Sequence, residues 1–407
     1  MTFLYLILAA FFAGTGLGYL KFFMLGVLCD QVYSPADKQW VIQAVGAIIT
    51  VGPCLIYAAS GPLAAAHRKF RVMFFSGATT AALLLFGALT GWAGTPWLYV
   101  FSTGLIMGIF NPAKNAAIPL EAAYGKRSTE LVNAALNISY LGGLLGGIPS
   151  GVWLYENHPN IGALTAILLF ALAGLCGGLC RFQDESAHLQ PFFPSVYNLL
   201  RDSSYLLRTY LVYILVSALI WGLASAVSLA ITAYAEEQNL GDAVACSLMS
   251  VYAVIGVVIG CAFSPKLTPW RYRTIIISTS CMALVMVAIP LTSQVLGPAG
   301  FDLKPDLIYR CVGTLTLILG VMFGVSTNLI EGEYFSLIYR EKKEGTGAAL
   351  LSAGTAFFAF LFGGMIGLSI HGGWVSATTQ FYWLAALTAV AALLTFKLPP
   401  NKNTNVT

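Results

Sequence analysis

Charged residues are scarce in this chain. Asp, Glu, Lys and Arg make up 9% of its 407 residues, whereas 58% of the residues are hydrophobic. Soluble globular domains have roughly a quarter of their residues charged. The composition therefore excludes a soluble domain and indicates a protein that crosses a membrane several times.

Residue sets that carry enzyme or metal chemistry are also missing. The eight cysteines fall mostly inside apolar runs, and none stands beside histidine at metal-ligand spacing, so they indicate neither a disulfide framework nor a zinc site. The chain has no nucleophile-plus-base set and no glycine-rich phosphate loop before a helix. We therefore expect no enzyme activity, no metal, no cofactor and no nucleic-acid partner.

Long apolar runs are what the chain has in abundance. Twelve of them are long enough to cross a bilayer as a helix, which takes about 20 residues. They are expected at 3–29, 39–60, 72–93, 97–118, 131–155, 160–180, 209–235, 244–266, 273–295, 309–330, 346–370 and 376–396. The first has no basic n-region and no evident cleavage site, so we expect it to be retained as a span.

The basic residues predict the orientation in the membrane. Sixteen of the 21 Lys and Arg fall in the loops after the even-numbered segments or in the C-terminal tail, and the opposite side holds only Lys38, Lys304 and Arg310. Because cytoplasmic loops are enriched in Lys and Arg, both termini are predicted to be cytoplasmic. The two remaining basic residues, Lys21 and Lys114, fall inside segments.

The longest cytoplasmic connection separates segments six and seven, so the chain divides six plus six. Short basic turns at 61–71 and 264–273 stand at equivalent positions of the two parts. Repeated six-segment halves are typical of transporters that rock around a central site. The expected units are an N-terminal half at 1–181, a cytoplasmic linker at 182–208, a C-terminal half at 209–397 and a polar tail at 398–407.

Three stretches resemble one family of transporters. The run I-M-G-I-F-N-P-A-K-N-A-A-I-P-L-E and its continuation, 106–147, is similar to the fourth and fifth spans of the bacterial lysophospholipid transporters of the major facilitator superfamily. Residues 251–267 are similar to that family's eighth span, and residues 336–350 to its tenth-to-eleventh connection. The resemblance implies an all-α, twelve-helix fold in two six-helix halves, and a function in lipid transport as a flippase.

The chain departs from that family at three charged positions. Members usually carry an Asp-Asn pair in the first span, where this chain has Leu17-Gly18. Ser228 takes the place of a basic residue in the seventh span, and Ala65 that of an acidic loop residue. We therefore expect the charges at the site to differ from the family in sign and place.

Lys114 stands in the run N-P-A-K-N, between two prolines at 112 and 119. Proline removes a backbone N–H and frees a carbonyl, and the side chains of Asn111 and Asn115 can bond to exposed backbone. Transporters place substrate contacts at such broken helices. Lys114 is predicted to face the cytoplasmic half of a cavity and to pair with Glu121 or a substrate anion. The alternative is a lysine that reaches the cytoplasmic interface.

Lys21 lies one helical turn after Leu17 in the first segment. The glycines at 14, 16 and 18 leave one side of this helix small, so that a neighbour or ligand can approach closely, and Tyr19 adds a polar group nearby. We predict that Lys21 lines the cavity. The alternative is a side chain that snorkels to the outer surface.

Two sets of residues are predicted to carry the function. The substrate path comprises Lys21, Tyr19, Asn111, Lys114, Asn115, Asn137, Trp221 and Ser228. The charges that gate the cytoplasmic end are Glu121, Arg68, Lys69, Glu331, Glu333 and Arg340. Aromatic walls for an acyl tail are expected from Phe22, Phe23, Phe110 and Trp221.

The positions of the acidic residues and histidines indicate whether transport is coupled to protons. No Asp or Glu falls in the middle of an expected segment, and the four histidines lie in loops or at segment ends. Proton-coupled transporters generally need such a group at membrane depth. We therefore expect transport without proton coupling. The missing first-span Asp also removes the partner for a cationic head group, which favours lysophosphatidylglycerol or another net anion over lysophosphatidylethanolamine.

The leading hypothesis is thus a transporter of lysophospholipids in the bacterial inner membrane, functionally coupled to an acyltransferase. The alternative is a transporter of a soluble organic anion or a drug-like compound, which would show no requirement for an acyl chain.

Overall fold

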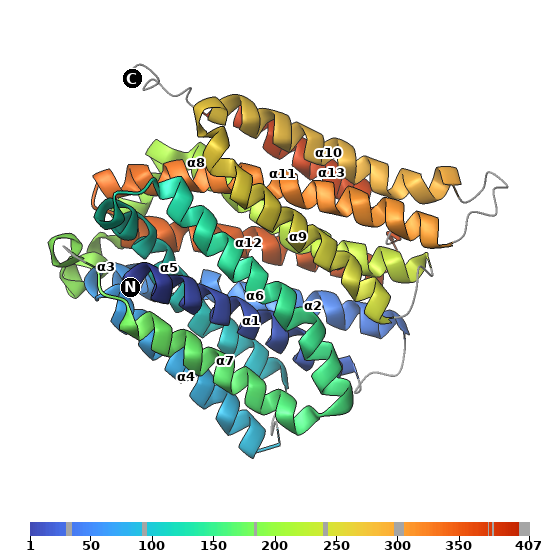
Figure 1. Ribbon diagram of the computed structural model, residues 1–407, viewed down its shortest axis with the longest axis horizontal. Helices are drawn as coiled ribbons and strands as arrows, with labels where there is room; N and C mark the ends of the chain where they lie inside the picture. Colours follow the sequence, from blue (N-terminus) through green and yellow to red (C-terminus); the bar gives the residue numbers. More distant parts are fainter. Residues whose placement is uncertain are drawn as a thin grey trace.

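The structure of the protein, a computed structural model, describes residues 1–29, 35–91, 96–182, 185–238, 243–296, 305–372, 374–376 and 378–398. Within these ranges every regular element is a helix (Figure 1). The first half comprises α1 (Thr2–Cys29), α2 (Pro35–Leu55), α3 (Tyr57–Ala66), α4 (Lys69–Leu89), α5 (Pro96–Gly125), α6 (Thr129–Asn157) and α7 (Pro159–Leu179).

The second half follows a short 3-10 turn, η1 (Glu185–His188). It comprises α8 (Phe192–Glu237), α9 (Ala243–Leu267), the 3-10 turn η2 (Thr268–Trp270), α10 (Arg271–Leu296), α11 (Pro305–Arg340), α12 (Glu344–His371) and α13 (Gln380–Thr395). Each of the twelve expected segments therefore overlaps a helix, with α2 and α3 together forming the second. Judged by length and apolar composition alone, seven helical stretches can cross a membrane, or eight when the bent pair is counted.

Three of the expected segments form helices that differ from the expectation. The second segment bends by 60° between α2 and α3, and Pro53 and Pro62 lie within these two helices. Helix α8 begins at Phe192, inside the expected linker, and its backbone leaves helical geometry at Tyr210. Helix α11 continues to Arg340, although the apolar run ends at residue 330, because polar side chains beyond that point find partners inside the protein.

Glycine allows the closest helix contacts in each half. Gly14 of α1 has no room for a Cβ because the carbonyl group of Tyr140 in α6 lies against it. Gly320 of α11 is placed in the same way against the carbonyl group of Ala253 in α9. Small residues let helix backbones approach closely, which is how membrane helices gain packing energy without a hydrophobic driving force. These contacts pack α1 tightly against α6 and α9 tightly against α11.

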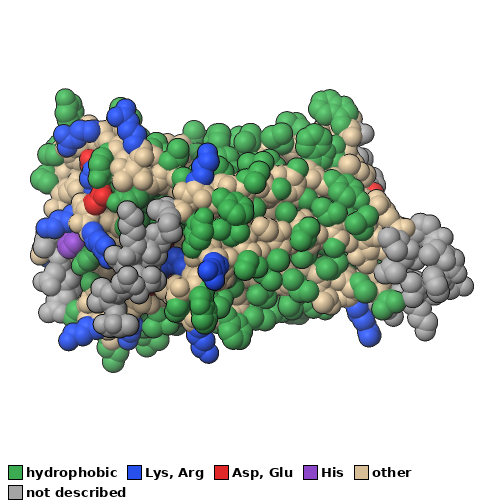
Figure 2. All heavy atoms as spheres, turned by 90° about the horizontal axis from the view of Figure 1, so that it is seen from above, with side chains coloured by type: hydrophobic (Ala, Val, Ile, Leu, Met, Phe, Trp, Pro, Cys, Tyr) green, Lys and Arg blue, Asp and Glu red, His purple; other side chains and the backbone are tan. Residues whose placement is uncertain are grey.

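Charge is distributed unevenly along the long axis of the bundle. In Figure 2, most of the visible Lys and Arg side chains lie toward one end, and hydrophobic side chains cover the middle. The start of α1 lies at that end (Figure 1), where the Thr2 hydroxyl donates to the carbonyl of Arg181, just after α7. This is the end that the basic loops predict to be cytoplasmic.

Candidate functional site

A cavity of about 400 Å³ lies between the two halves. Its wall is built by α1, α2, α5 and α6 of the first half and by α8, α9, α11 and α12 of the second. Most of the wall is apolar, with side chains such as Leu17, Phe22, Ile49 and Met107. Among the lining residues that the structure describes, only Lys21, Lys114 and Glu331 carry charge.

Lys114 is buried in this wall, with 6% of its surface exposed. Its Nζ lies 4.4 Å from the centroid of the Tyr140 ring, within the range of a cation–π contact. The expected break around Lys114 is absent, because α5 continues as one helix through Pro112 and Pro119 to Gly125. The lysine is thus presented from a continuous helix and not from a broken one.

Glu331 occupies a different place from the one predicted for it. The sequence places it among the charges at the cytoplasmic end, whereas the structure places it in the cavity wall, 7% exposed and nine residues before the end of α11. Its Oε1 accepts hydrogen bonds from Trp221 Nε1 at 2.7 Å and Ser217 Oγ at 3.1 Å, and its Oε2 accepts one from Asn133 Nδ2 at 3.4 Å. A carboxylate therefore lies at the cavity, which corrects the expectation that none does.

Glu331 is also the acidic partner of Lys114. It attracts the ammonium group across the cavity, but the two form no ion pair within 4.0 Å in the described structure. The predicted partner, Glu121, instead pairs with Arg127, with 3.4 Å between Oε1 and Nη1. Lys114 and Glu331 come from opposite halves, so a substrate that contacts both also bridges the halves.

Lys21 lines the cavity from α1, as predicted, and its neighbour Tyr19 does not. The Tyr19 ring is fully buried and stacks on the Phe23 ring, with 6.0 Å between the two ring centroids. The Tyr19 hydroxyl lies beside Gly162 of α7. Successive residues on a helix point about 100° apart, so two residues that differ by two positions face different neighbours. Tyr19 therefore belongs to the packing between α1 and α7.

The other predicted path residues divide in a similar way. Four of them line the cavity: Asn111, Asn115, Asn137 and Trp221. The side chain of Ser228 lies outside the described residues. Of the expected aromatic walls, Phe22 and Trp221 line the cavity, whereas Phe23 and Phe110 are buried behind it. The wall residues Asn137 and Tyr140, together with Asn133 beside Glu331, share one face of α6 through their spacing of four and three residues, a pattern visible in the sequence.

A charged cluster joins the two halves at the starts of α6 and α10, and we call Glu130, Arg271 and Glu333 the latch. The guanidinium of Arg271 in α10 binds the carboxylate of Glu130 in α6 and lies 3.1 Å from Glu333 Oε2 in α11. Asn328 Nδ2 donates to the carbonyl of Glu130 at 3.1 Å, and Asn133 Nδ2 donates to Asn328 Oδ1 at 2.9 Å. The latch therefore joins the two halves and connects through Asn133 to Glu331. Of its members, only Glu333 was predicted.

The remaining predicted gate charges lie near the helix ends that the basic loops predict to be cytoplasmic, and Lys69 is buried there. Lys69 Nζ lies 3.8 Å from Glu185 Oε1, and the backbone N–H of Lys69 donates to the same oxygen at 2.6 Å. Burial raises the pKa of the Glu185 carboxyl above its usual range, and the N–H and the charges of Lys69 and Arg68 act in the opposite direction. Arg340 is exposed at the end of α11.

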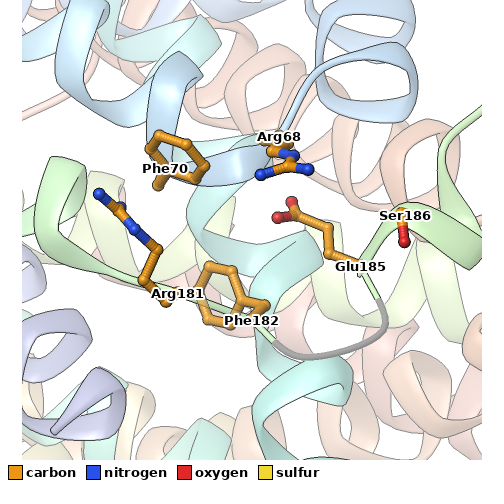
Figure 3. Close-up of a pocket in the computed structure, with 6 residues that line it drawn as sticks. All are labelled: Arg68, Phe70, Arg181, Phe182, Glu185 and Ser186. Carbon is orange, nitrogen blue, oxygen red and sulfur yellow. The ribbon is translucent and has the colours of Figure 1, made fainter.

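A second pocket, of about 90 Å³, lies beside Glu185 (Figure 3). Figure 3 shows the Glu185 carboxylate pointing toward Arg68 and the Arg181 guanidinium beside the Phe70 ring. The Cζ atom of Arg181 lies 4.4 Å from the centroid of the Phe70 ring. Arg181 Nη1 also donates hydrogen bonds to the carbonyls of Gly178 and Cys180. These contacts tie the linker to the start of α4, so we assign this pocket a structural role.

No protein-family model and no curated protein sequence matches this chain. Solved structures do match it over nearly its whole length. The human organic anion transporter MFSD10 (TETRAN) aligns with a TM-score of 0.64 at 13% identity, covering 97% of both chains. The proton:xylose symporter XylE aligns with a TM-score of 0.73 at 12% identity, covering 98% of this chain and 96% of that one.

A bacterial homologue of the iron transporter ferroportin, in an outward-facing state, aligns with a TM-score of 0.59 at 15% identity, covering 98% of this chain and 99% of that one. The XylE structure is described as a member of the major facilitator superfamily. The predicted fold is therefore confirmed: this chain is an all-α membrane protein with the major facilitator fold.

Proposed function

We propose that this chain is an alternating-access transporter that moves an amphipathic anion, in the first place a lysophospholipid, across the bacterial inner membrane. The observation that carries this proposal is the pair Lys21 and Lys114, which α1 and α5 present to one cavity with a largely apolar wall. Charged groups at membrane depth are costly and are typically retained where they bind a substrate or ion.

The chemistry of the wall suits a molecule with one charged and one apolar part. A phosphate can accept charge-assisted hydrogen bonds from the two ammonium groups. An acyl chain can pack on the aliphatic and aromatic side chains that make up the rest of the wall, such as Phe22 and Met107. The resemblance of residues 106–147 to lysophospholipid transporters supports the same substrate class, and a functional link to an acyltransferase would follow from it.

We further propose that transport needs no proton gradient, although Glu331 lies at the cavity. Trp221 can only donate through its indole nitrogen, so its bond to Glu331 Oε1 favours a carboxylate over a carboxylic acid at that oxygen. Ser217 and Asn133 add two further donors, and Lys114 adds a positive charge across the cavity. These groups offset part of the cost of burying a negative charge at Glu331.

The second candidate is a transporter of a soluble organic anion. One structure with the same fold is described as a human organic anion transporter, and two lysines in a cavity are equally suited to a carboxylate. This candidate differs from the first in one testable respect, because it gives the apolar wall no acyl chain to bind.

Competition for uptake separates the two candidates. Proteoliposomes that contain the purified protein are supplied with labelled lysophosphatidylglycerol and an excess of an unlabelled competitor. We expect unlabelled lysophosphatidylglycerol to block uptake and glycerophosphoglycerol, the same head group without its acyl chain, to leave it unchanged. Equal inhibition by both compounds would favour the soluble anion, and a chain-length series would then show no trend.

A further inference from the structure

The three charged side chains that line the cavity come from three different helices. Lys21 comes from α1, Lys114 from α5 and Glu331 from α11. When all three are ionised, they sum to one positive charge, and no other described lining residue is charged. The cavity is therefore neither a simple cationic site nor a neutral one.

We infer that the cavity selects substrates with a net charge of minus one, and that Glu331 is the residue that sets this selectivity. The inference rests on the proposed function and refines its substrate class. Its central observation is a carboxylate held in the wall of an anion site, where a site built only to attract anions would have none.

The contacts of Glu331 hold its carboxyl group in place. The hydrogen bonds from Ser217, Trp221 and Asn133 come from α8 and α6, so they fix the carboxylate from two sides. The absence of a close ion pair with Lys114 in the described structure leaves the lysine free to contact a ligand. Glu331 thus lowers the positive charge of the site without blocking its lysine.

Net charge matters here because an unbalanced charge is costly away from water. A monoanion neutralises the occupied cavity. A dianion leaves one negative charge next to Glu331, and a zwitterion leaves one lysine without a counterion. Closure of the two halves around the substrate removes water from the site, so it makes each imbalance more unfavourable. The monoanion is therefore the substrate that permits closure.

Three lysolipids with one acyl chain and different head groups test this. At pH 8, lysophosphatidylglycerol carries one negative charge, lysophosphatidic acid carries nearly two because its second phosphate pKa is about 6, and lysophosphatidylethanolamine is zwitterionic. Their affinities are measured by competition binding to the purified protein. The same measurement is made with Glu331→Gln, with Lys21→Gln and with the double variant. Glu237→Gln is the matched control, since Glu237 is an exposed residue outside the cavity wall.

The native protein should prefer the monoanion. Glu331→Gln should raise the affinity for the dianion relative to the monoanion by about tenfold or more. The reason is that the substitution removes the negative charge that repels the second charge of the dianion. Lys21→Gln should shift preference toward the zwitterion. The double variant again sums to one positive charge and should regain the native preference, which also shows that the Glu331→Gln substitution does not by itself prevent folding. The control should match the native protein.

An unchanged ratio in Glu331→Gln, or a double variant that keeps the altered preference, would overturn the inference. The three head groups without acyl chains, glycerophosphoglycerol, glycerol phosphate and glycerophosphoethanolamine, separate this outcome from failure of the proposed function. If these bind in the same charge order while the lysolipids do not bind, the charge selectivity stands and the lipid substrate is wrong. If none of the six compounds binds, both proposals fail.

Discussion

Lys114 combines deep burial with an incomplete set of partners. Its ammonium group rests against the Tyr140 ring and is attracted by Glu331 from the opposite half, but it makes no close ion pair with a described residue. A cation–π contact contributes about 0.5–2 kcal/mol, much less than the cost of burying an ammonium group without a counterion. On the proposed function, the remaining interaction is available to the substrate anion.

Removal of the Lys114 charge should therefore abolish most transport. We expect Lys114→Ala to bind an anionic substrate more weakly by about 1.5–3 kcal/mol, the usual value of a hydrogen bond to a charged group, and to remain folded. Lys114→Arg should also transport poorly, because a planar guanidinium does not replace a compact ammonium group against the Tyr140 ring. Binding and uptake are measured with Lys397→Ala, an exposed lysine, as the control. Native uptake by Lys114→Ala would reduce this residue to a structural one.

The sequence identifies the two lysines and the asparagines of the cavity because polar groups stand out inside apolar runs. It does not identify the place of Glu331, because hydropathy ends the tenth segment at residue 330 while the helix continues to Arg340. Hydropathy averaged along the sequence treats each polar residue as unfavourable in the membrane and takes no account of its hydrogen-bond partners. Glu331 is tolerated through Trp221, Ser217 and Asn133, which become neighbours only when α6, α8 and α11 pack together.

At the scale of elements, α11 connects the cavity with the cytoplasmic latch. Glu331 lines the cavity, and Glu333, two residues later, binds Arg271 in the latch. Asn133 of α6 donates to both Glu331 and Asn328, so the start of α6 is tied to α11 at the same level. On the proposed function, a ligand that contacts Glu331 therefore acts on the two helices, α6 and α11, that the latch joins.

Loss of the latch arginine should loosen the cytoplasmic end. Arg271→Met leaves the buried carboxylate of Glu130 and the half-buried one of Glu333 without their cation, and removing one partner of a buried ion pair costs roughly 3–5 kcal/mol. We expect faster amide hydrogen exchange at the start of α6, residues 129–133, and a lower Tm. Arg273→Met removes an exposed arginine two residues away and is the control. Identical exchange in both variants would show that the latch does not hold the halves together.

The sequence predicts well which segments form helices, and it predicts less well where each helix begins and ends. A bilayer requires long apolar helices, so the twelve runs all correspond to helical structure. The bend between α2 and α3 and the extension of α8 into the linker depend on packing at the cytoplasmic end. There, Tyr57 of α3 hydrogen-bonds Ser203 of α8 at 2.5 Å, between residues far apart in the sequence.

At the scale of the whole molecule, the two halves meet at the latch and together line the cavity. The halves are joined at the cytoplasmic end by side chains of α6, α10 and α11. Alternating access requires these contacts to break while a second set forms at the opposite end. A cavity whose charge is balanced only when it is occupied gives a physical reason for this change to wait for the substrate.

Movement of lysophosphatidylglycerol across the membrane of proteoliposomes tests this account most directly. The labelled lipid is added to one leaflet, with and without an imposed pH gradient, and protein-free liposomes give the background. We expect movement well above background that is equal with and without the gradient and does not acidify the lumen. Movement no faster than in protein-free liposomes would contradict transport of this lipid. Strict dependence on the gradient, lost in Glu331→Gln, would contradict a fixed charge at Glu331 and make it the proton carrier.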